Sequence, residues 1–175
     1  MNRHLRWAFA LALLPIAACS SNPPPAPVAV APAPPALAAV DQTFANAAAS
    51  SDATEIQAAQ LAKTKTKAPR IIHFADRMIA DHTKSTQQLT TILQSKGVTP
   101  TATPGDLTAL QAESGRRFDR DYMRGQVTAH IAAVKLFQDE IANGQDADIK
   151  SFAQATLPTI QDHLKMARAI SGFHG

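Results

Sequence analysis

Four ionisable side chains lie on the apolar faces of otherwise hydrophobic segments, each close to the middle of its segment. They are Glu55, His82, His130 and His163. If the segments are antiparallel helices, their middle turns share one layer, so this spacing predicts one carboxylate and three imidazoles converging inside the core. Buried charge is costly unless it is paired or bound to a metal. Three histidines with one glutamate could hold one divalent transition-metal ion such as Zn, Cu, Fe or Ni.

A buried polar network that fixes the register of the helices is the alternative for these four groups. Histidines on apolar stripes are commonly hydrogen-bonded to a neighbouring side chain or a backbone carbonyl. Asp81 and Asp162 each precede one of the histidines and point about 100° away from it around the helix. They are candidates for contacts that support the histidines or join two helices. Tyr122 and Asp119 are further candidates for such supporting contacts.

No pattern typical of catalysis accompanies these residues. The sequence has no Gly-rich phosphate loop, nucleophile elbow, Cys-x-x-Cys pair or zincin motif. It also has no Glu-x-x-His pair, which a ferritin-type di-iron centre requires. We therefore expect no enzyme, and a redox reaction at the metal is the weakest of the functional hypotheses.

Four amphipathic helices are the elements that must position these residues. Apolar residues recur at alternating steps of three and four, which indicates one inward stripe per helix in an all-α, antiparallel four-helix bundle over residues 40–175. The first stripe runs through Phe44, Ala48, Ser51, Glu55, Ala58 and Ala62. Capping and Pro/Gly signals, with Asp41 as the first N-cap, predict helices over about 41–65, 69–97, 116–142 and 147–170, with a helical lead-in at 106–112.

A basic start and the short apolar run 7–18 open the chain. The run is shorter than the roughly 20 residues that a membrane-spanning helix needs, so it is typical of a signal peptide. It ends in Ile16-Ala17-Ala18-Cys19, which looks like a lipobox whose cysteine receives lipid. Ser20, where Asp would indicate retention in the inner membrane, favours the outer membrane. We expect an exported protein on the periplasmic face of the outer membrane, held by lipid on Cys19.

The segment after the cysteine is rich in Pro and Ala. Proline at this density removes N–H donors and fixes φ, so neither helix nor sheet forms. We expect a lipoprotein signal peptide at 1–18 and, at 19–39, the lipidated cysteine with a disordered, extended tether. The bundle would then stand away from the membrane surface.

The part of the chain after the signal peptide is nearly neutral. The whole sequence has 17 Lys and Arg against 14 Asp and Glu, and residues 1–18 account for two of the arginines. A nearly neutral domain gives no electrostatic reason to bind nucleic acid. One cysteine allows neither an intrachain disulfide nor a thiolate cluster. The membrane is therefore the expected partner, and a protein partner stays unknown.

Several motifs agree in order and spacing with one bacterial family, across roughly residues 40–171. The chain resembles the domain-of-unknown-function family 4142, and Glu55 matches an acidic position on that family's first helix. The resemblance implies a ferritin-like four-helix bundle in an exported or outer-membrane protein, and it supplies no activity. The matching motifs are Phe74-Ala75-x-x-Met78-x-x-Asp81-His82, Phe118-Asp119-x-x-Tyr122, His130 and Leu157-Pro158-x-x-x-x-His163-Leu164.

Two functions stay open at this point. The first is an envelope lipoprotein that acts as a structural or interaction module, with a polar core network and no chemistry. The second is a periplasmic metal-binding protein, in metal handling or stress protection, with ligands Glu55, His82, His130 and His163. Only the second predicts stoichiometric metal and a rise in melting temperature when metal is added.

Overall fold

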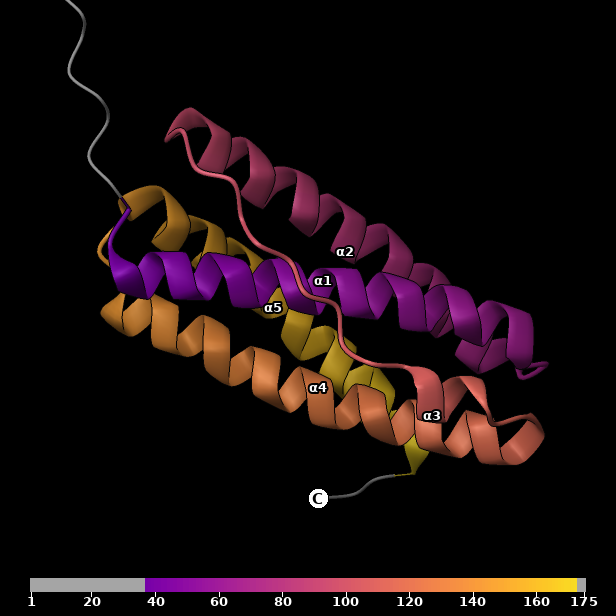
Figure 1. Ribbon diagram of the computed structural model, residues 1–175. Coiled ribbons are helices and arrows are strands. Elements are labelled where there is room, and N and C mark those ends of the chain that lie inside the picture. Colours follow the sequence, from indigo (N-terminus) through magenta and orange to yellow (C-terminus); the bar gives the residue numbers. More distant parts are fainter. Residues whose placement is uncertain (1–36, 173–175) are drawn as a thin grey trace, which may run out of the picture. The chain divides into compact units, whose positions relative to one another are not determined.

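The computed structural model describes residues 37–172. The predicted signal peptide, the lipidated Cys19 and most of the predicted tether lie outside this range. The described part forms four long helices and one short one (Figure 1), namely α1 (Ala39–Lys65), α2 (Pro69–Ser95), α3 (Thr108–Gln111), α4 (Gly115–Asn143) and α5 (Ala147–Ser171). The all-α prediction is confirmed, and each observed boundary lies within two residues of the prediction, with the lead-in shorter at both ends. Among the described helices, none has both the length and the apolar character that crossing a membrane requires.

Each long helix packs against two others, and all neighbours run antiparallel. α1 packs against α2 and α4, and α5 packs against the same two helices. Three-residue turns join α1 to α2 and α4 to α5, which makes two hairpins. The crossover that contains α3 runs along α1 and returns the chain to the other end of the bundle before α4 begins (Figure 1). One long crossover between two hairpins is the connectivity of ferritin-like bundles.

A ladder of hydrogen bonds holds this crossover against α1. Side chains one turn apart on α1 accept from alternate backbone N–H groups of the crossover. One helical turn of four residues rises about 6 Å, and two extended residues advance about 6.6 Å, so the two repeats stay in register. The pairs are Asn46 with Thr101 (2.8 Å), Ser50 with Thr103 (2.9 Å) and Thr54 with Gly105 (2.8 Å).

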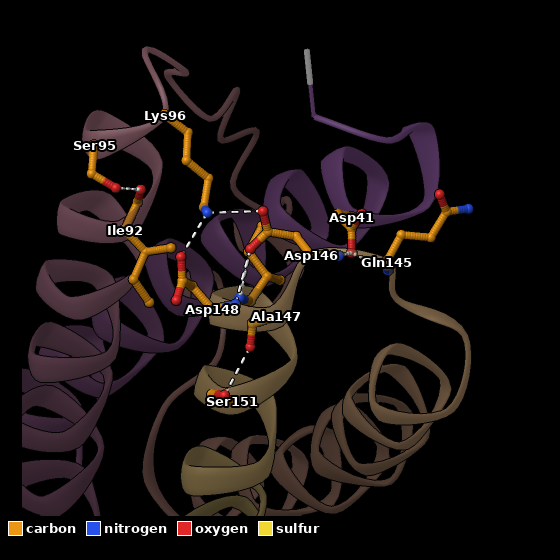
Figure 2. A network of polar contacts seen from close by, with 10 residues as sticks. Asp41, Ile92, Ser95, Lys96, Gln145, Asp146, Ala147, Asp148 and Ser151 are labelled. Atoms are coloured by element: carbon orange, nitrogen blue, oxygen red, sulfur yellow. Dashed lines mark hydrogen bonds and ion pairs between the residues drawn. The ribbon is translucent and has the colours of Figure 1, made fainter. Parts of the chain in front are cut away.

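Asp41 does not cap α1, so that prediction is wrong. The helix begins two residues earlier, and Asp41 is buried inside its first turn. Its Oδ1 accepts from the backbone N–H groups of Gln145 and Asp146, at 2.9 and 3.1 Å, in the turn between α4 and α5 (Figure 2). Asp146 is itself the N-cap of α5 and pairs with Lys96. The start of α1 is therefore tied to the second hairpin rather than capped.

The core consists of two apolar clusters with polar residues between them. Phe74 and Tyr122 belong to one cluster, and Phe44 and Phe137 belong to the other. The buried histidines come from positions between the two clusters on α2, α4 and α5. The predicted polar layer therefore lies inside the bundle, where apolar packing on both sides fixes the helices that carry it.

Candidate metal centre

Three histidines from three different helices meet in the core. His82 on α2, His130 on α4 and His163 on α5 are 6, 1 and 1 % exposed. Their ring centroids form a triangle with sides of 5.4 to 5.8 Å. One ring nitrogen from each histidine lies within 4.8 Å of those of the other two. Three imidazoles of the four predicted groups are thus brought together.

Two of the rings are held by carboxylates from a neighbouring helix. His82 Nδ1 lies 2.8 Å from Asp52 Oδ1, which joins α2 to α1. His163 Nε2 lies 2.9 Å from Asp81 Oδ2, which joins α5 to α2. A carboxylate can only accept, so each of these ring nitrogens donates its N–H. The same bonds therefore fix the tautomer and the orientation of both rings.

The third ring is held by its own helix. His130 Nδ1 donates to the backbone carbonyl of Gln126, one turn earlier on α4, at 2.9 Å. The second nitrogen of each ring is buried and has no hydrogen-bond partner within residues 37–172: Nε2 of His82, Nε2 of His130 and Nδ1 of His163. With the other nitrogen protonated, each of these three atoms carries a lone pair that is free to bind a metal.

Burial keeps the imidazoles of His130 and His163 neutral. Burial is the main cause that lowers the pKa of His130 to about 4; the hydrogen bond to the Gln126 carbonyl opposes this shift, and the nearby His82 adds to it. Burial also lowers the pKa of His163 to about 4, against the opposing effect of its bond to Asp81. Burial opposes ionisation of Asp81 as well, but hydrogen bonds from His163 and Arg77 outweigh it and lower the pKa of that carboxyl. A neutral imidazole beside an ionised carboxylate is the state that metal ligation requires.

A small cavity adjoins two of the histidines. It has a volume of about 20 Å³ and is lined by His82 and His163 together with Ser85 and residues of all four long helices. A cavity of roughly 10–15 Å³ or more has room for one water molecule. The space beside the rings therefore suits one atom-sized guest.

Glu55 does not join the histidine group. Its carboxylate is buried, and Oε2 accepts from Gln126 Nε2 at 2.6 Å. Burial raises the pKa of Glu55, although the nearby His82 and the bond from Gln126 oppose that rise. Glu55 lies on the wall of a separate pocket of about 310 Å³ between α1, α3 and α4. Asp52, one turn earlier on α1, is the residue that contacts a histidine.

Three of the proposed supporting residues lie away from the rings. Asp162 is exposed on α5. Asp119 lies eleven residues before His130, or roughly 16 Å along the helix axis. Tyr122 is buried, but the Phe74 ring lies between it and His130, at 6.3 and 6.4 Å from the two rings. Only Asp81 among the four candidates holds a histidine.

Sequence reasoning missed Asp52 and Gln126. The predicted stripe of α1 passed through Ser51, which is half-buried, whereas Asp52 is 4 % exposed. A second stripe of the same spacing, through Ala48, Asp52, Glu55, Ala59 and Ala62, was equally regular and is buried throughout. Gln126 acts through its backbone carbonyl, which every residue has, so its side-chain type carries no signal for this contact.

The family described as Domain of unknown function (DUF4142) matches residues 26–170. None of the curated proteins matches the sequence. Solved structures with the same fold include a DUF305 fragment from Deinococcus radiodurans, at 12 % identity and a TM-score of 0.70, covering 79 % of this chain and 99 % of that one. Another is a conserved hypothetical protein, rv2844, from Mycobacterium tuberculosis, at 17 % identity and a TM-score of 0.63, covering 78 % and 93 %.

CopM is a third protein with a similar structure. Its Cu(I)-bound form is 22 % identical, with a TM-score of 0.66, and covers 77 % of this chain and 98 % of CopM. CopM has also been solved in Cu(II)-bound, Ag-bound and apo forms. The TM-scores show that these proteins share the helical fold, and at such low sequence identities the likeness extends to the fold alone.

Proposed function

The chain belongs to the DUF4142 family, whose description gives no activity, and we propose that it binds one late transition-metal ion through His82, His130 and His163. One observation carries the proposal: in a group of histidines that bring one nitrogen each within 4.8 Å of the others, every ring has one nitrogen hydrogen-bonded and the other buried and unpartnered. Three buried acceptor nitrogens without a hydrogen-bond donor are energetically costly. A metal ion satisfies all three at once.

The distances suit such an ion after a small closure of the rings. Bonds of about 2.0–2.1 Å from a metal to imidazole place the nitrogens of a tetrahedral site about 3.4 Å apart. One nitrogen from each ring lies within 4.8 Å of those of the other two, so the nitrogens must approach one another by at most about 1.4 Å. Imidazole ligands suit Zn, Cu, Fe and Ni, and exclude the hard cations Mg and Ca as natural occupants.

The charges also suit a divalent ion. Asp52 and Asp81 each accept from one of the ligating rings. Together they place two negative charges next to the site, which would balance the charge of a divalent ion in a poorly solvated core. Carboxylates behind metal-bound histidines orient the rings and raise their basicity. Copper and silver bind to CopM, a protein of the same fold, so copper belongs in the first set of metals tested, beside zinc.

Metal content tests this proposal. We expect about one metal ion per chain in the full-length protein, purified without an affinity tag and loaded with Zn(II) or Cu(II), by mass spectrometry. The variant with His82→Ala, His130→Ala and His163→Ala should hold none. Because that variant could unfold, His130→Gln, which is close in volume, should independently weaken binding at least 100-fold.

The matched control is His73→Ala, which removes an exposed histidine from α2. It should retain the full metal content. If the wild-type protein takes up neither ion, the proposal fails, and the histidines serve as a polar network that fixes helix register. That outcome would favour the function of a structural or interaction module.

We also propose that the metal site is held in the periplasm by lipid on Cys19. The lipobox-like Ile16-Ala17-Ala18-Cys19 and the Pro/Ala-rich segment after it support this placement. Several acyl chains on one cysteine bind a bilayer firmly, since each buried CH₂ contributes about 0.8 kcal/mol. A Cys19→Ser variant should leave the membrane fraction, and a variant that stays membrane-bound would contradict the proposal.

A further inference from the structure

Ser85 breaks a pattern that other hydroxyls of these helices follow. A serine or threonine within a helix commonly donates to a carbonyl one turn earlier. Ser50, Thr86 and Ser151 do so at 2.7 to 2.9 Å. The Ser85 hydroxyl is buried, and the described residues offer it no hydrogen-bond partner. A buried hydroxyl without a partner in the protein indicates a bound water or ligand that supplies the missing hydrogen bond.

The cavity of about 20 Å³ beside the histidines is the site where such a water or ligand would bind. Ser85 lines this cavity together with His82 and His163. Ser85 is 6 % exposed, so bulk water does not readily satisfy its hydroxyl. The threonines Thr156 and Thr159 add further hydroxyls to the wall. The cavity is therefore small and mostly apolar, with a few polar groups on its wall, and two of the three histidines line it.

We infer that the metal held by the three histidines keeps an open fourth position, which faces Ser85 and takes water or a small anion. This inference rests on the proposed function. Three protein ligands leave one vacancy in a tetrahedral shell, and Glu55, the fourth predicted ligand, bonds to Gln126 instead. An open position distinguishes a site that can exchange ligands from a closed structural site.

The pocket fits a small ligand whose negative or lone-pair donor atom occupies the space beside the histidines. The donor atom binds the metal, and the same ligand accepts a hydrogen bond from the Ser85 hydroxyl. Asp52 and Asp81 already balance a divalent ion, so a neutral water should be the resting ligand. A small anion would replace it in a concentration-dependent manner.

Cobalt(II) provides the test, because its visible spectrum reports coordination number and ligand exchange. The full-length protein is loaded with Co(II) and titrated with sodium azide. We expect a tetrahedral Co(II) spectrum that shifts on adding azide. Ser85→Ala should weaken azide binding about tenfold, which corresponds to the loss of one hydrogen bond to a charged ligand. Ser95→Ala, which removes an exposed serine from the same helix, should leave azide binding unchanged.

The outcomes separate the two claims. If Co(II) binds and azide leaves the spectrum unchanged, the site is closed, and the inference fails while the metal site stands. If azide binds equally well to the wild type and to Ser85→Ala, the open position does not face Ser85, and the inference fails as stated. If none of Co(II), Zn(II) and Cu(II) binds in the presence of the three histidines, the proposed function fails and the inference fails with it.

Discussion

At the scale of single residues, the hydrogen bonds behind the rings decide what the site can do. Asp81 and Asp162 both directly precede a histidine in the sequence, but only Asp81 touches a ring. Asp81 fixes the proton of His163 on Nε2, which leaves Nδ1 as the free donor atom. The carboxylate that matters for His163 therefore comes from the adjacent helix and not from its own neighbour in sequence.

Replacing these two aspartates tests that distinction. Asp81→Asn keeps a hydrogen-bond acceptor but removes the negative charge, so we expect metal affinity to fall about 10- to 100-fold. Asp162→Asn should bind metal as the wild type does. Competition with a chromophoric chelator measures both affinities. Equal losses in the two variants would show that net charge, and not the bond to His163, sets the affinity.

The sequence could predict the three histidines because each lies on a regular apolar stripe near the middle of a helix. It could not rank Glu55 against Asp52, since both lie on the inner side of α1 and differ by less than one turn. Which of them faces His82 depends on the rotation of α1 against α2. The sequence does not reveal that rotation, because the many small alanines of α1 cover a face too broad to define a single inward direction.

A second buried acid lies far from the histidines. Glu140 on α4 is 2 % exposed, and neither carboxylate oxygen has a hydrogen-bond partner within the described chain. Burial raises its pKa to about 7, with further contributions from Asp41 and Asp146 that Lys150 partly offsets. Its unfolded pKa is about 4.5, so the folded protein binds more protons between these two values. The contribution of Glu140 to stability is therefore complete below pH 4.5 and is lost as the pH rises through 7.

The variant Glu140→Gln removes this titration. We expect the stability difference, wild type minus variant, to fall by roughly 1–3 kcal/mol between pH 4.5 and 8. Urea unfolding at several pH values measures it. The lowered pKa values of His130 and His163 have the opposite effect, since they reduce stability as the pH falls from 6.5 towards 4. Both residues are common to the two proteins, so their effect cancels in the difference. A difference that does not change with pH would contradict the assignment.

At the scale of elements, the crossover ladder links α1 to the segment that leads into α4. Thr54 accepts from the backbone N–H of Gly105 at 2.8 Å and donates to the carbonyl of Ser50. Thr43, on the same helix, only donates to the carbonyl of Ala39. The two threonines therefore differ by one hydrogen bond between segments that are distant in sequence.

The matched substitutions Thr54→Ala and Thr43→Ala isolate that bond. We expect Thr54→Ala to lose about 1 kcal/mol of unfolding free energy and to speed amide exchange at Gly105. Thr43→Ala should change stability by less than about 0.5 kcal/mol, since it alters only a bond within its own helix. Urea unfolding and hydrogen exchange check these values. If the two variants behave alike, the ladder does not hold the crossover.

The ladder also marks a limit of prediction at this scale. Helix bounds followed from Pro69, Gly97 and Gly144, whose backbone constraints act locally. The contacts of the crossover could not be predicted, because Asn, Ser and Thr on α1 are equally suited to bond within their own helix. Asp41 was misread for the same reason, since a good N-cap residue is also a good acceptor for a distant turn.

At the scale of the whole molecule, the site joins every long helix of the bundle. The three ligand rings come from α2, α4 and α5, and α1 adds Asp52 behind one of them. Elsewhere the two hairpins meet through apolar packing and through further polar contacts. At one end Lys96 bridges Asp146 and Asp148 at 2.8 and 2.7 Å (Figure 2), and at the other Arg70 donates to the Ala169 carbonyl. A bound ion would therefore stabilise the tertiary arrangement and not one helix.

The central claim is that three specific nitrogens are free to bind metal, and histidine side-chain ¹⁵N NMR tests it most directly. Without metal, His82 and His130 should carry their proton on Nδ1, and His163 on Nε2. Adding one equivalent of Zn(II) should shift Nε2 of His82 and His130 and Nδ1 of His163, and leave the exposed His73 unchanged. If the three buried rings keep their spectra while zinc is present, or if the opposite nitrogens shift, the site proposed here is wrong.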